Sequence, residues 1–532
     1  MTVNAKNDDG RPASATAVRN AAELIAELRH QISDAGRPEA TERAHNSGRL
    51  TVRERIALLI DPGTFNEYGS FAHPDDFATL RDAPADGLVT GTGLVDGRPI
   101  AVAASDFTVA GGSDGKLGVH KLARIAELAL RRGIPLVMLL EGGGHRITEG
   151  LDSRTFGYGG VEGFEYLSRL SGWAPIVCAV MGPGFAGPAN YAAFADLVLM
   201  VEGRSAMGLA GPALVKAAIG EDLDKEQLGG ARFHVEKTGM ADLACRDDAE
   251  VIRHIKTFLS YLPTNASQQA PRLPERPDAT AWVEELRTII PENRKRAYDV
   301  KKIIRLIVDD GEIFELHPQW AKNAVTGLAR INGHSVGVVA NNPMYLAGAL
   351  DANASEKIAR FITFCSAFGL PIVSLCDTPG FMVGSRSELQ GVLRRSAKVV
   401  HALAHSHVPL YSVILRKGYG LGWNAMGGGR AFGNDILLAW PSAEILAMSI
   451  EGAVDVALRR QWQNADDPAA ARQALIDRFL WEGRAERAAA AFTVDELIDP
   501  AETRARLTMA LRNYVGPAVL QMPPKRHGIA PL

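Results

Sequence analysis

An internal repeat at a fixed spacing constrains the fold of this 532-residue chain more than any other feature. Matching residue types recur 236 residues further along the chain, as from Gly97 to Gly333. The matching segments are Gly91–Gly97 with Gly327–Gly333, Lys121 with Lys357, Arg124 with Arg360, and Gly133–Pro135 with Gly369–Pro371. One offset held over so many positions is hard to obtain by chance, and such a repeat decides the architecture. We therefore predict two copies of one domain.

Each copy has the same order of predicted elements: strand, hairpin turn, strand, helix, strand, glycine-rich turn, helix, strand. The long helices are expected at residues 116–132 and 355–368, and the strands after them at residues 136–140 and 372–376. Repeated β-β-α units with parallel strands form an α/β superhelix, whose ligand sites lie at strand ends beside helix N-termini. A duplication that was kept only for packing is the alternative.

The composition is that of a globular enzyme. Apolar residues make up 46% of the chain and charged residues 22%, and a net charge of −3 provides no basic surface for DNA or RNA. Residues 1–19 lack the apolar core of a signal peptide, and no segment is long and apolar enough to span a membrane. The four scattered cysteines form no CxxC pair. We therefore expect buried free thiols, no metal site and a cytoplasmic location.

Changes in composition along the chain set the expected domain limits. Residues 1–20 are polar and are predicted to be a disordered N-terminal arm. Residues 21–270 contain the first copy and its leading helices, one of which begins with a capping box at Thr51. The proline-rich segment at residues 262–277 is the expected linker, and residues 271–532 contain the second copy.

Four glycine-rich turns are the strongest candidates for binding sites. They follow two buried strands in each copy and cover Glu141–Gly144, Gly182–Gly187, Asp377–Gly380 and Gly418–Gly422. The strand expected at residues 176–181 leads directly into the second of them. Glycine lets a ligand approach the main chain, whose N–H groups can hold a negatively charged oxygen. Two such turns on neighbouring strands predict one crevice, so two copies predict two oxyanion sites; tight corners without a ligand are the alternative.

Side chains suited to catalysis are few. The chain contains no GxSxG, HExxH or Walker A motif and no convincing dinucleotide fingerprint. His145 and Glu149 flank the first turn and could act as acid and base, although a role in orienting the backbone or starting a helix is favoured. Three basic pairs could bind anions: Lys121 with Arg124, Lys357 with Arg360, and Arg416 with Lys417. The first two pairs are expected on solvated helix faces, and the third is the better anion candidate.

Several longer motifs carry a resemblance to a known family. They are His45–Ile56 (HNSGRLTVRERI), Glu226–His234 (EQLGGARFH), Ala354–Phe361 (ASEKIARF), Asp377–Phe381 (DTPGF) and the tail Pro523–Gly528 (PPKRHG). From about His45 onward the chain resembles the carboxyltransferase (β) subunits of biotin-dependent acyl-CoA carboxylases. These are the propionyl-, acetyl- and methylcrotonyl-CoA carboxylase type.

The resemblance implies a tandem crotonase-like (ClpP/crotonase) fold and a homo-hexameric core. In that family acyl-CoA binds the N-terminal domain of one protomer and biotin binds the C-terminal domain of its neighbour. The carboxyl group moves from carboxybiotin to the α carbon of the acyl-CoA through an enolate. One oxyanion hole holds the thioester oxygen and the other holds the ureido oxygen of biotin. Because the chain has no Met-Lys-Met site and no ATP-binding module, a separate biotinylated α subunit with biotin carboxylase activity is implied.

The family's functional positions map onto the four turns. The implied oxyanion-hole residues are Ala186, Gly187, Gly420, Leu421 and Gly422. The implied substrate-binding residues are Gly143, Gly144, Gly184, Trp423 and Asn424, and the implied biotin-binding residues are Gly380 and Phe381. No side-chain base is implied, because a biotin nitrogen accepts the α proton.

Departures from the family pattern point to a divergent acyl substrate. Where the family usually has Ala-Gly-Gly, this chain has proline at Pro188, which has no N–H to donate. Around the second hole, Gly-Gly-Ala-Tyr-Asp is replaced by Gly-Leu-Gly-Trp-Asn, ending at Asn424. Three other functions stay open: a biotin-dependent acyl-CoA decarboxylase, a non-catalytic scaffold paralogue, and a hydratase that uses Glu149.

Overall fold

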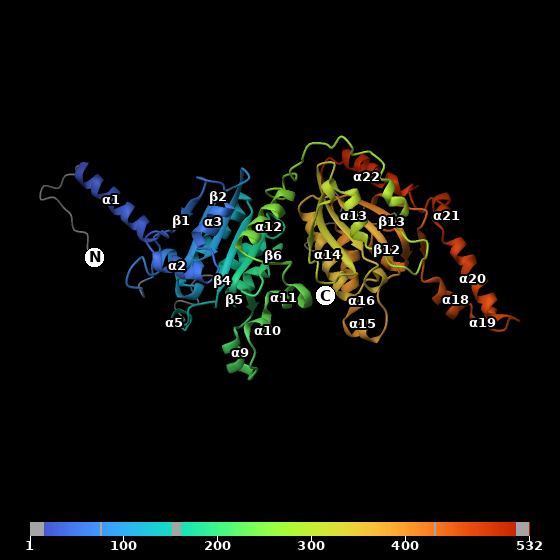
Figure 1. Cartoon of the computed structure of the whole chain (residues 1–532), viewed down its shortest axis with the longest axis horizontal. Helices are drawn as coiled ribbons and strands as arrows, with labels where there is room; N and C mark the ends of the chain where they lie inside the picture. Colours follow the sequence, from blue (N-terminus) through green and yellow to red (C-terminus); the bar gives the residue numbers. More distant parts are fainter. Residues whose placement is uncertain are drawn as a thin grey trace, which may run out of the picture. The chain divides into compact units, whose positions relative to one another are not determined.

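The computed structural model describes residues 15–74, 77–151, 161–429, 432, 434–517 and 531. The chain forms two compact units, one built mainly from residues up to Lys256 and the other mainly from residues after it (Figure 1). The short segments 172–175 and 234–243 belong to the second unit. The expected motif at Pro523–Gly528 lies outside the described residues.

The sheet of the first unit has the strand order β1-β2-β3-β4-β5-β6-β8, with β7 beside β5. Its strands are β1 (Asn66–Tyr68), β2 (Leu88–Val95), β3 (Arg98–Ser105), β4 (Leu136–Gly142), β5 (Ile176–Phe185), β6 (Leu197–Val201), β7 (Ala206–Gly208) and β8 (Leu243–Cys245). β1, β2 and β3 pair antiparallel, whereas β3 to β6 are parallel. The parallel strands β4 and β6 are buried throughout, as strands covered on both faces must be.

The sheet of the second unit repeats this plan in the order β16-β14-β13-β12-β11-β10-β9, with β15 beside β13. Its strands are β9 (Ile313–Leu316), β10 (Ala324–Ile331), β11 (His334–Asn341), β12 (Ile372–Thr378), β13 (Leu410–Tyr419), β14 (Asn434–Ala439), β15 (Glu444–Leu446) and β16 (Glu496–Leu497). The hairpin β10–β11 begins and ends 236 residues after the hairpin β2–β3, whose limits are Leu88 and Ser105. The repeat in the sequence is therefore a repeat of the structure.

Helices cover the sheets of both units. In the first unit they are α1 (Ala15–Gln31), α2 (Pro38–Asn46), α3 (Val52–Leu59), α4 (Lys116–Arg132), α5 (Ile147–Gly150), α7 (Val161–Leu170), α8 (Gly187–Ala192), α9 (Pro212–Ile219), α10 (Lys225–Gly229) and α11 (Ala231–Phe233), followed by α12 (Asp248–Tyr261). In the second unit they are α13 (Val300–Ile307), α14 (Ala352–Ala367), α15 (Ser385–Leu389), α16 (Val392–Ala404), α17 (Gly420–Ala425), α18 (Ile450–Ala457), α19 (Arg459–Gln463), α20 (Pro468–Glu482), α21 (Ala485–Ala490) and α22 (Thr503–Arg512).

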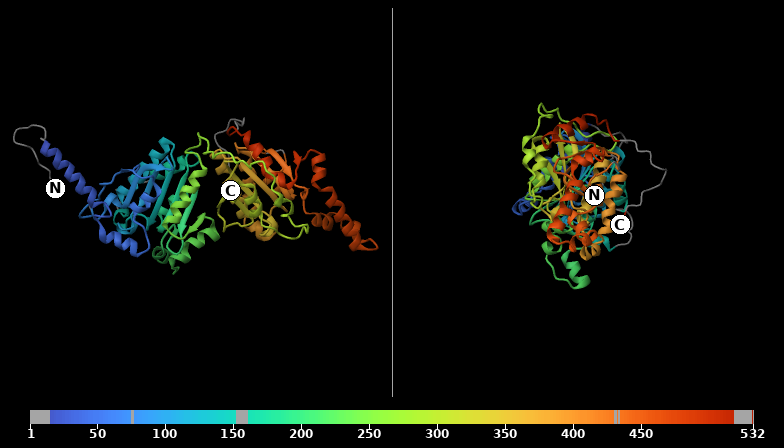
Figure 2. Two further views of the ribbon diagram at one scale, coloured as in Figure 1. Left: turned by 45° about the horizontal axis from the view of Figure 1, so that its top comes forward. Right: turned by 90° about the vertical axis from the view of Figure 1, so that its right-hand side faces the viewer.

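Local signals explain where several helices begin. α4 has the limits expected from the sequence, and α3 begins with the expected capping box at Thr51. α14 begins at Ala352 rather than Ser355, because the Asp351 side chain accepts a hydrogen bond from the main chain of its first turn. α1 begins at Ala15, so residues 15–20 are helical rather than disordered, as the high helix propensity of alanine favours. Figure 2 shows α1 extending away from the body of its unit.

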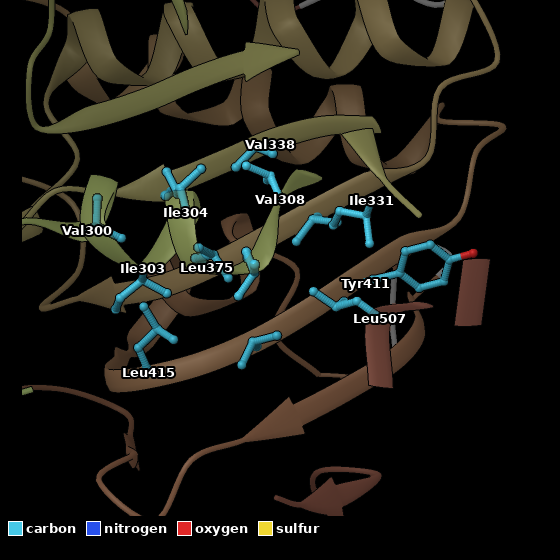
Figure 3. Close-up of a cluster of buried hydrophobic side chains, with 14 of the residues drawn as sticks. Val300, Ile303, Ile304, Val308, Ile331, Val338, Leu375, Tyr411, Leu415 and Leu507 are labelled. Carbon is cyan, nitrogen blue, oxygen red and sulfur yellow. The ribbon is translucent and has the colours of Figure 1, made fainter. Parts of the chain in front are cut away.

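The core of the second unit lies between its sheet and two helices (Figure 3). α13 contributes Val300, Ile303, Ile304 and Ile307, which recur at helical spacing and are fully buried. α22 contributes Leu507, and the strands contribute buried side chains such as those of Val338, Leu375 and Leu415. Burial of each such side chain stabilises the fold by about 1.5–3 kcal/mol, so this cluster fixes the strands whose ends carry the candidate site.

The cysteines and the membrane-spanning potential of the chain were also predicted from the sequence. All four cysteines, Cys178, Cys245, Cys365 and Cys376, are buried and free. Burial raises the pKa of the Cys245 thiol to about 12 and that of the other three still further. Within the described residues, no helix is both long and apolar enough to cross a bilayer.

Candidate active site

The central strands of both units run further than the sequence pattern indicated. β5 was expected to end at Met181, but it continues to Phe185 because Gly184 and Phe185 pair with β7. Gly182 and Gly184 therefore lie within a strand rather than in a turn. β13 likewise continues to Tyr419 through its pairing with β15. In each unit the chain leaves the sheet abruptly, and a short helix begins at once.

A residue with positive φ makes the corner in each unit. Ala186 follows β5 with φ 55° and ψ −108°, and α8 begins at the next residue. Gly420 follows β13 with φ 56°, and it is the first residue of α17. Such a conformation suits glycine, whereas it costs a residue with a Cβ about 1–3 kcal/mol. A strained alanine at this corner indicates that the surrounding structure holds the main chain in one orientation.

The first corner offers one main-chain donor. The Ala186 amide donates to the Gly208 carbonyl oxygen at 2.9 Å, so it is not free to bind a ligand. Pro188 has no N–H. The Gly187 amide lies at the first position of α8, where helices leave N–H groups without an intrahelical acceptor. Among the described residues it has no acceptor.

The second corner offers more donors. The amides of Gly420, Leu421 and Gly422 occupy the first turn of α17 and donate to no carbonyl or side chain in the described part of the chain. The Leu421 side chain is 56% exposed, so this turn faces the surface. The two corners therefore share a geometry but differ in the number of N–H groups that a ligand can reach.

The two turns of each unit converge on these corners, as the sequence predicted. A Cβ at Gly144, which has φ 85°, would lie 2.8 Å from the Ala186 Cβ and 3.6 Å from the Gly187 nitrogen. A Cβ at Gly422 would lie 2.6 Å from the Gly380 Cα. Only glycine fits at these two points, because the turns lie in contact there. Gly143 is exposed beside Gly144, with open space around its Cα.

Other expected binding residues have structural partners. Gly184 is buried, and a Cβ there would lie 2.6 Å from Val180 Cγ1. Trp423 packs against a buried apolar cluster that includes Ile414, and the Asn424 side chain donates to the Gly428 carbonyl oxygen at 3.2 Å. The main chain of Phe381 pairs with that of Leu350.

A buried carboxylate stands before the first turn in each unit, and the sequence interpretation missed both. Glu141 lies 2.5 Å from both Arg49 and Arg55. Asp377, 236 residues later, lies 3.0 Å from Arg416 and 3.2 Å from Lys417. The prediction that Arg416 and Lys417 bind an external anion is therefore wrong, because Asp377 occupies both.

The remaining side-chain candidates also have internal partners. Glu149 accepts a hydrogen bond from the Lys116 amide at 2.6 Å and one from Arg146 at 3.2 Å. It thus caps the start of α4, as the favoured interpretation held. The main chain of His145 pairs with that of Asp114.

Lys121 and Lys357 are not on solvated helix faces, and that expectation is wrong. Each ammonium group donates to three main-chain carbonyl oxygens: those of Gly69, Ala85 and Leu88 for Lys121, and those of His317, Trp320 and Ala324 for Lys357. Burial lowers the pKa of Lys121 to about 8 and that of Lys357 to about 7. Arg124, in contrast, forms an exposed pair with Glu127.

Asp114 is a further residue that the sequence interpretation missed. A Cβ added at Gly187 would overlap Oδ2 of Asp114, so this carboxyl group lies against the first corner. Burial raises its pKa to about 6, the Arg146 charge opposes the rise, and the Asp86 charge adds to it. The repeat offers a signal that could have found it, because the matching residue is the apolar Leu350.

Comparison with known proteins identifies the family. The family model described as "Carboxyl transferase domain" matches residues 43–530. The chain belongs to the carboxyl transferase domain family. It is 38% identical over 512 residues to a propionyl-CoA carboxylase carboxyltransferase subunit of Haloferax mediterranei, covering 96% of this chain and 98% of the relative. It is 37% identical over 508 residues to a methylmalonyl-CoA decarboxylase subunit alpha of Propionigenium modestum, covering 95% and 97%.

A solved member of the carboxyl transferase family has the same fold. The transcarboxylase 12S structure, determined with methylmalonyl-coenzyme A and methylmalonic acid bound, superposes with a TM-score of 0.88 at 36% identity and covers 99% of both chains. The resemblance seen in the sequence, the tandem α/β fold and the assignment to carboxyl-transferring enzymes are confirmed. The roles of individual residues stay predictions.

Proposed function

We propose that this chain is the carboxyltransferase subunit of a biotin-dependent acyl-CoA carboxylase. The observation that carries the proposal is the repeated corner, at which Gly187 in one unit and Leu421 in the other present unpaired main-chain amides. Carboxyl transfer to a thioester develops negative charge on two oxygens, and preorganised donors stabilise such charge strongly. Biotin, when bound, supplies the activated carboxyl group and accepts the α proton of the acyl-CoA.

The two units take different parts of the reaction in this proposal. The Gly187 amide, with Ala186 as its strained support, holds the thioester oxygen of the acyl-CoA while the enolate forms. Gly143, Gly144 and Gly184 leave room for the thioester to approach the main chain. Because no side chain near this corner is needed as the base, the chain's task is to position the substrate and stabilise its charge.

The second corner fits the ureido oxygen of biotin. Its support is that the amides of Gly420, Leu421 and Gly422 have no internal acceptor, and that Gly380 touches Gly422 where a side chain would intrude. Gly380 and Phe381 would flank the biotin ring, and Trp423 and Asn424 would shape the acyl pocket through the loop that they hold. The biotin is carried by a separate biotinylated α subunit that has biotin carboxylase activity.

The assembly and location are part of the proposal. The transcarboxylase 12S relative is described as a hexamer, and we propose a homo-hexameric core for this chain, with residues 21–270 on the acyl-CoA side and residues 271–532 on the biotin side. We also propose that the complex is cytoplasmic and that this chain needs no metal ion.

Decarboxylation is the second candidate function, because a relative at 37% identity is named as a methylmalonyl-CoA decarboxylase subunit. The same corners would serve the reverse transfer. The test is to purify the chain with its biotinylated partner and to supply ATP, bicarbonate and a panel of acyl-CoAs. Formation of a carboxylated acyl-CoA with ADP supports the proposal. Release of CO2 from a carboxyacyl-CoA alone indicates a decarboxylase, and an intact complex without either activity indicates a scaffold.

A further inference from the structure

Asp114 and Leu350 occupy equivalent positions in the two units and make equivalent main-chain hydrogen bonds. The Asp114 amide donates to the Gly144 carbonyl oxygen at 2.8 Å, and its own carbonyl oxygen accepts from the Arg146 amide at 3.0 Å. The Leu350 amide donates to the Gly380 carbonyl oxygen at 3.0 Å, and its carbonyl oxygen accepts from the Met382 amide at 2.9 Å. Since leucine satisfies the fold at this position, the carboxyl group of Asp114 has another role.

The Asp114 side chain is directed at the candidate oxyanion corner. A methyl group added at Gly187 would overlap its Oδ2 atom. Within the described chain, no hydrogen-bond donor is placed on this carboxyl group. The neighbouring cation, Arg146, is bound to Asp86 and Glu149 instead. A polar group that is held against the corner without an internal partner is positioned to meet a ligand.

The two corners differ in a way that complements this difference. The second corner has an N–H at Gly422 and an apolar side chain at Leu350. The first corner has Pro188, which lacks an N–H, in the place of Gly422, and it has Asp114 in the place of Leu350. One donor is thus missing from the main chain at the corner where one carboxyl group has been added.

We propose that the protonated carboxyl group of Asp114 donates a hydrogen bond to the thioester oxygen of the acyl-CoA and replaces the donor that Pro188 cannot provide. The inference rests on the proposed function, because it assigns a donor to the first oxyanion site. As the α proton leaves the substrate, negative charge develops on the thioester oxygen, and the Asp114 O–H bond strengthens its interaction with that oxygen. No covalent bond to Asp114 forms or breaks.

The electrostatic surroundings favour the neutral acid. Burial raises the pKa of Asp114 to about 6, and the Asp86 carboxylate adds to the rise. The Tyr191 hydroxyl on α8 also faces this group, and its own pKa is raised by burial and by Asp114. Arg146 opposes the rise. A substrate oxygen that becomes negative raises the pKa of Asp114 further, and neutral carboxylic acids are known to serve as oxyanion donors in apolar sites.

The test compares two variants of the full chain in complex with its biotinylated partner. Asp114→Leu is the residue that the other unit carries, so it removes the donor without disturbing the main chain. Asp114→Asn keeps a donor but cannot ionise. We expect Asp114→Leu to lower kcat/KM for propionyl-CoA by about 10- to 100-fold at every pH. We expect wild-type kcat/KM to fall as Asp114 ionises above about pH 6, and Asp114→Asn to lose this decline.

A second measurement separates this inference from the proposed function. Calorimetry of propionyl-CoA binding near pH 7, in two buffers of different ionisation enthalpy, reports proton uptake without any turnover. We expect wild type to take up a fraction of a proton and both variants to take up none. Wild-type kcat/KM and pH dependence in Asp114→Leu, or equal uptake in all three proteins, would overturn the inference. A wild-type complex that takes up the proton but carboxylates no acyl-CoA would instead contradict the proposed function.

Discussion

Ala186 and Gly420 make the same corner in the two units with almost the same φ, 55° and 56°. Glycine adopts this conformation without steric cost, whereas alanine does not. In the first unit two hydrogen bonds hold the strained residue, one from the Ala186 amide to Gly208 and one from the Asn190 amide to the Ala186 carbonyl oxygen. The corner that carries the candidate oxyanion site is therefore maintained at the expense of stability.

Relief of this strain is the first prediction. We expect Ala186→Gly to raise the free energy of unfolding by about 1 kcal/mol, because the strain of about 1–3 kcal/mol exceeds the entropic cost of glycine. Gly420→Ala is the matched reverse change. It should destabilise the protein, since the new Cβ would lie 2.9 Å from the Ala447 carbonyl oxygen. Thermal unfolding of the two variants measures both effects, and a lower stability of Ala186→Gly would show that the corner is not strained.

The second prediction concerns the amide donor at Leu421. We expect Leu421→Pro to lower kcat by about 100- to 1000-fold, because proline removes an oxyanion donor and yet is tolerated in the first turn of a helix. Leu421→Ala is the control, since it keeps the amide and removes a side chain that is 56% exposed. Steady-state carboxylation assays on the intact complex measure the difference. Equal rates for the two variants would exclude this amide from the site.

The third prediction concerns the buried lysine of the second unit. Lys357 is 3% exposed, and its ammonium group satisfies three carbonyl oxygens. We expect Lys357→Met to lower the free energy of unfolding by about 3–5 kcal/mol, because each buried carbonyl group left without a donor costs about 1–3 kcal/mol. Arg124→Ala serves as the control. It removes an exposed pair with Glu127 and should change stability by less than about 0.5 kcal/mol in the same thermal unfolding experiment.

The fourth prediction is a pH dependence of stability set by Asp114. Its folded pKa of about 6 lies above the ordinary value of 3.8, so the folded protein binds this proton more tightly than the unfolded chain does. The resulting stabilisation is complete below about pH 4 and is lost as the pH rises through about 6. Asp114→Asn should therefore be more stable than wild type by about 1–3 kcal/mol at pH 8 and equally stable at pH 4. A constant difference between the two proteins from pH 4 to pH 8 would contradict the assigned pKa.

The duplicated fold could be predicted because its signals are local. Hairpin glycines such as Gly97 and Gly333, and the buried strands between them, recur at one spacing that survives wherever the main chain repeats. The end of β5 could not be predicted, because its last residues form a strand only through pairing with β7. Pairing of that kind is a tertiary contact, and local patterns do not report it.

The candidate site was predictable in outline and not in its details. The glycine turns located both corners, but the loss of the Ala186 amide to Gly208 depends on a strand that follows later in the chain. Lys121 and Lys357 resemble solvent-facing lysines in sequence, because charged residues are seldom buried. Only distant carbonyl groups make their burial possible. Asp114, in contrast, could have been found by aligning the two copies and asking where a carboxylate replaces an apolar residue.

The hydrogen bonds around Asp114 and Leu350 run entirely through the main chain, so they do not depend on which side chain is present. A duplicated enzyme built in this way can specialise its halves separately. One substitution retunes the chemistry of a single half, while the geometry inherited from the common ancestor is retained in both.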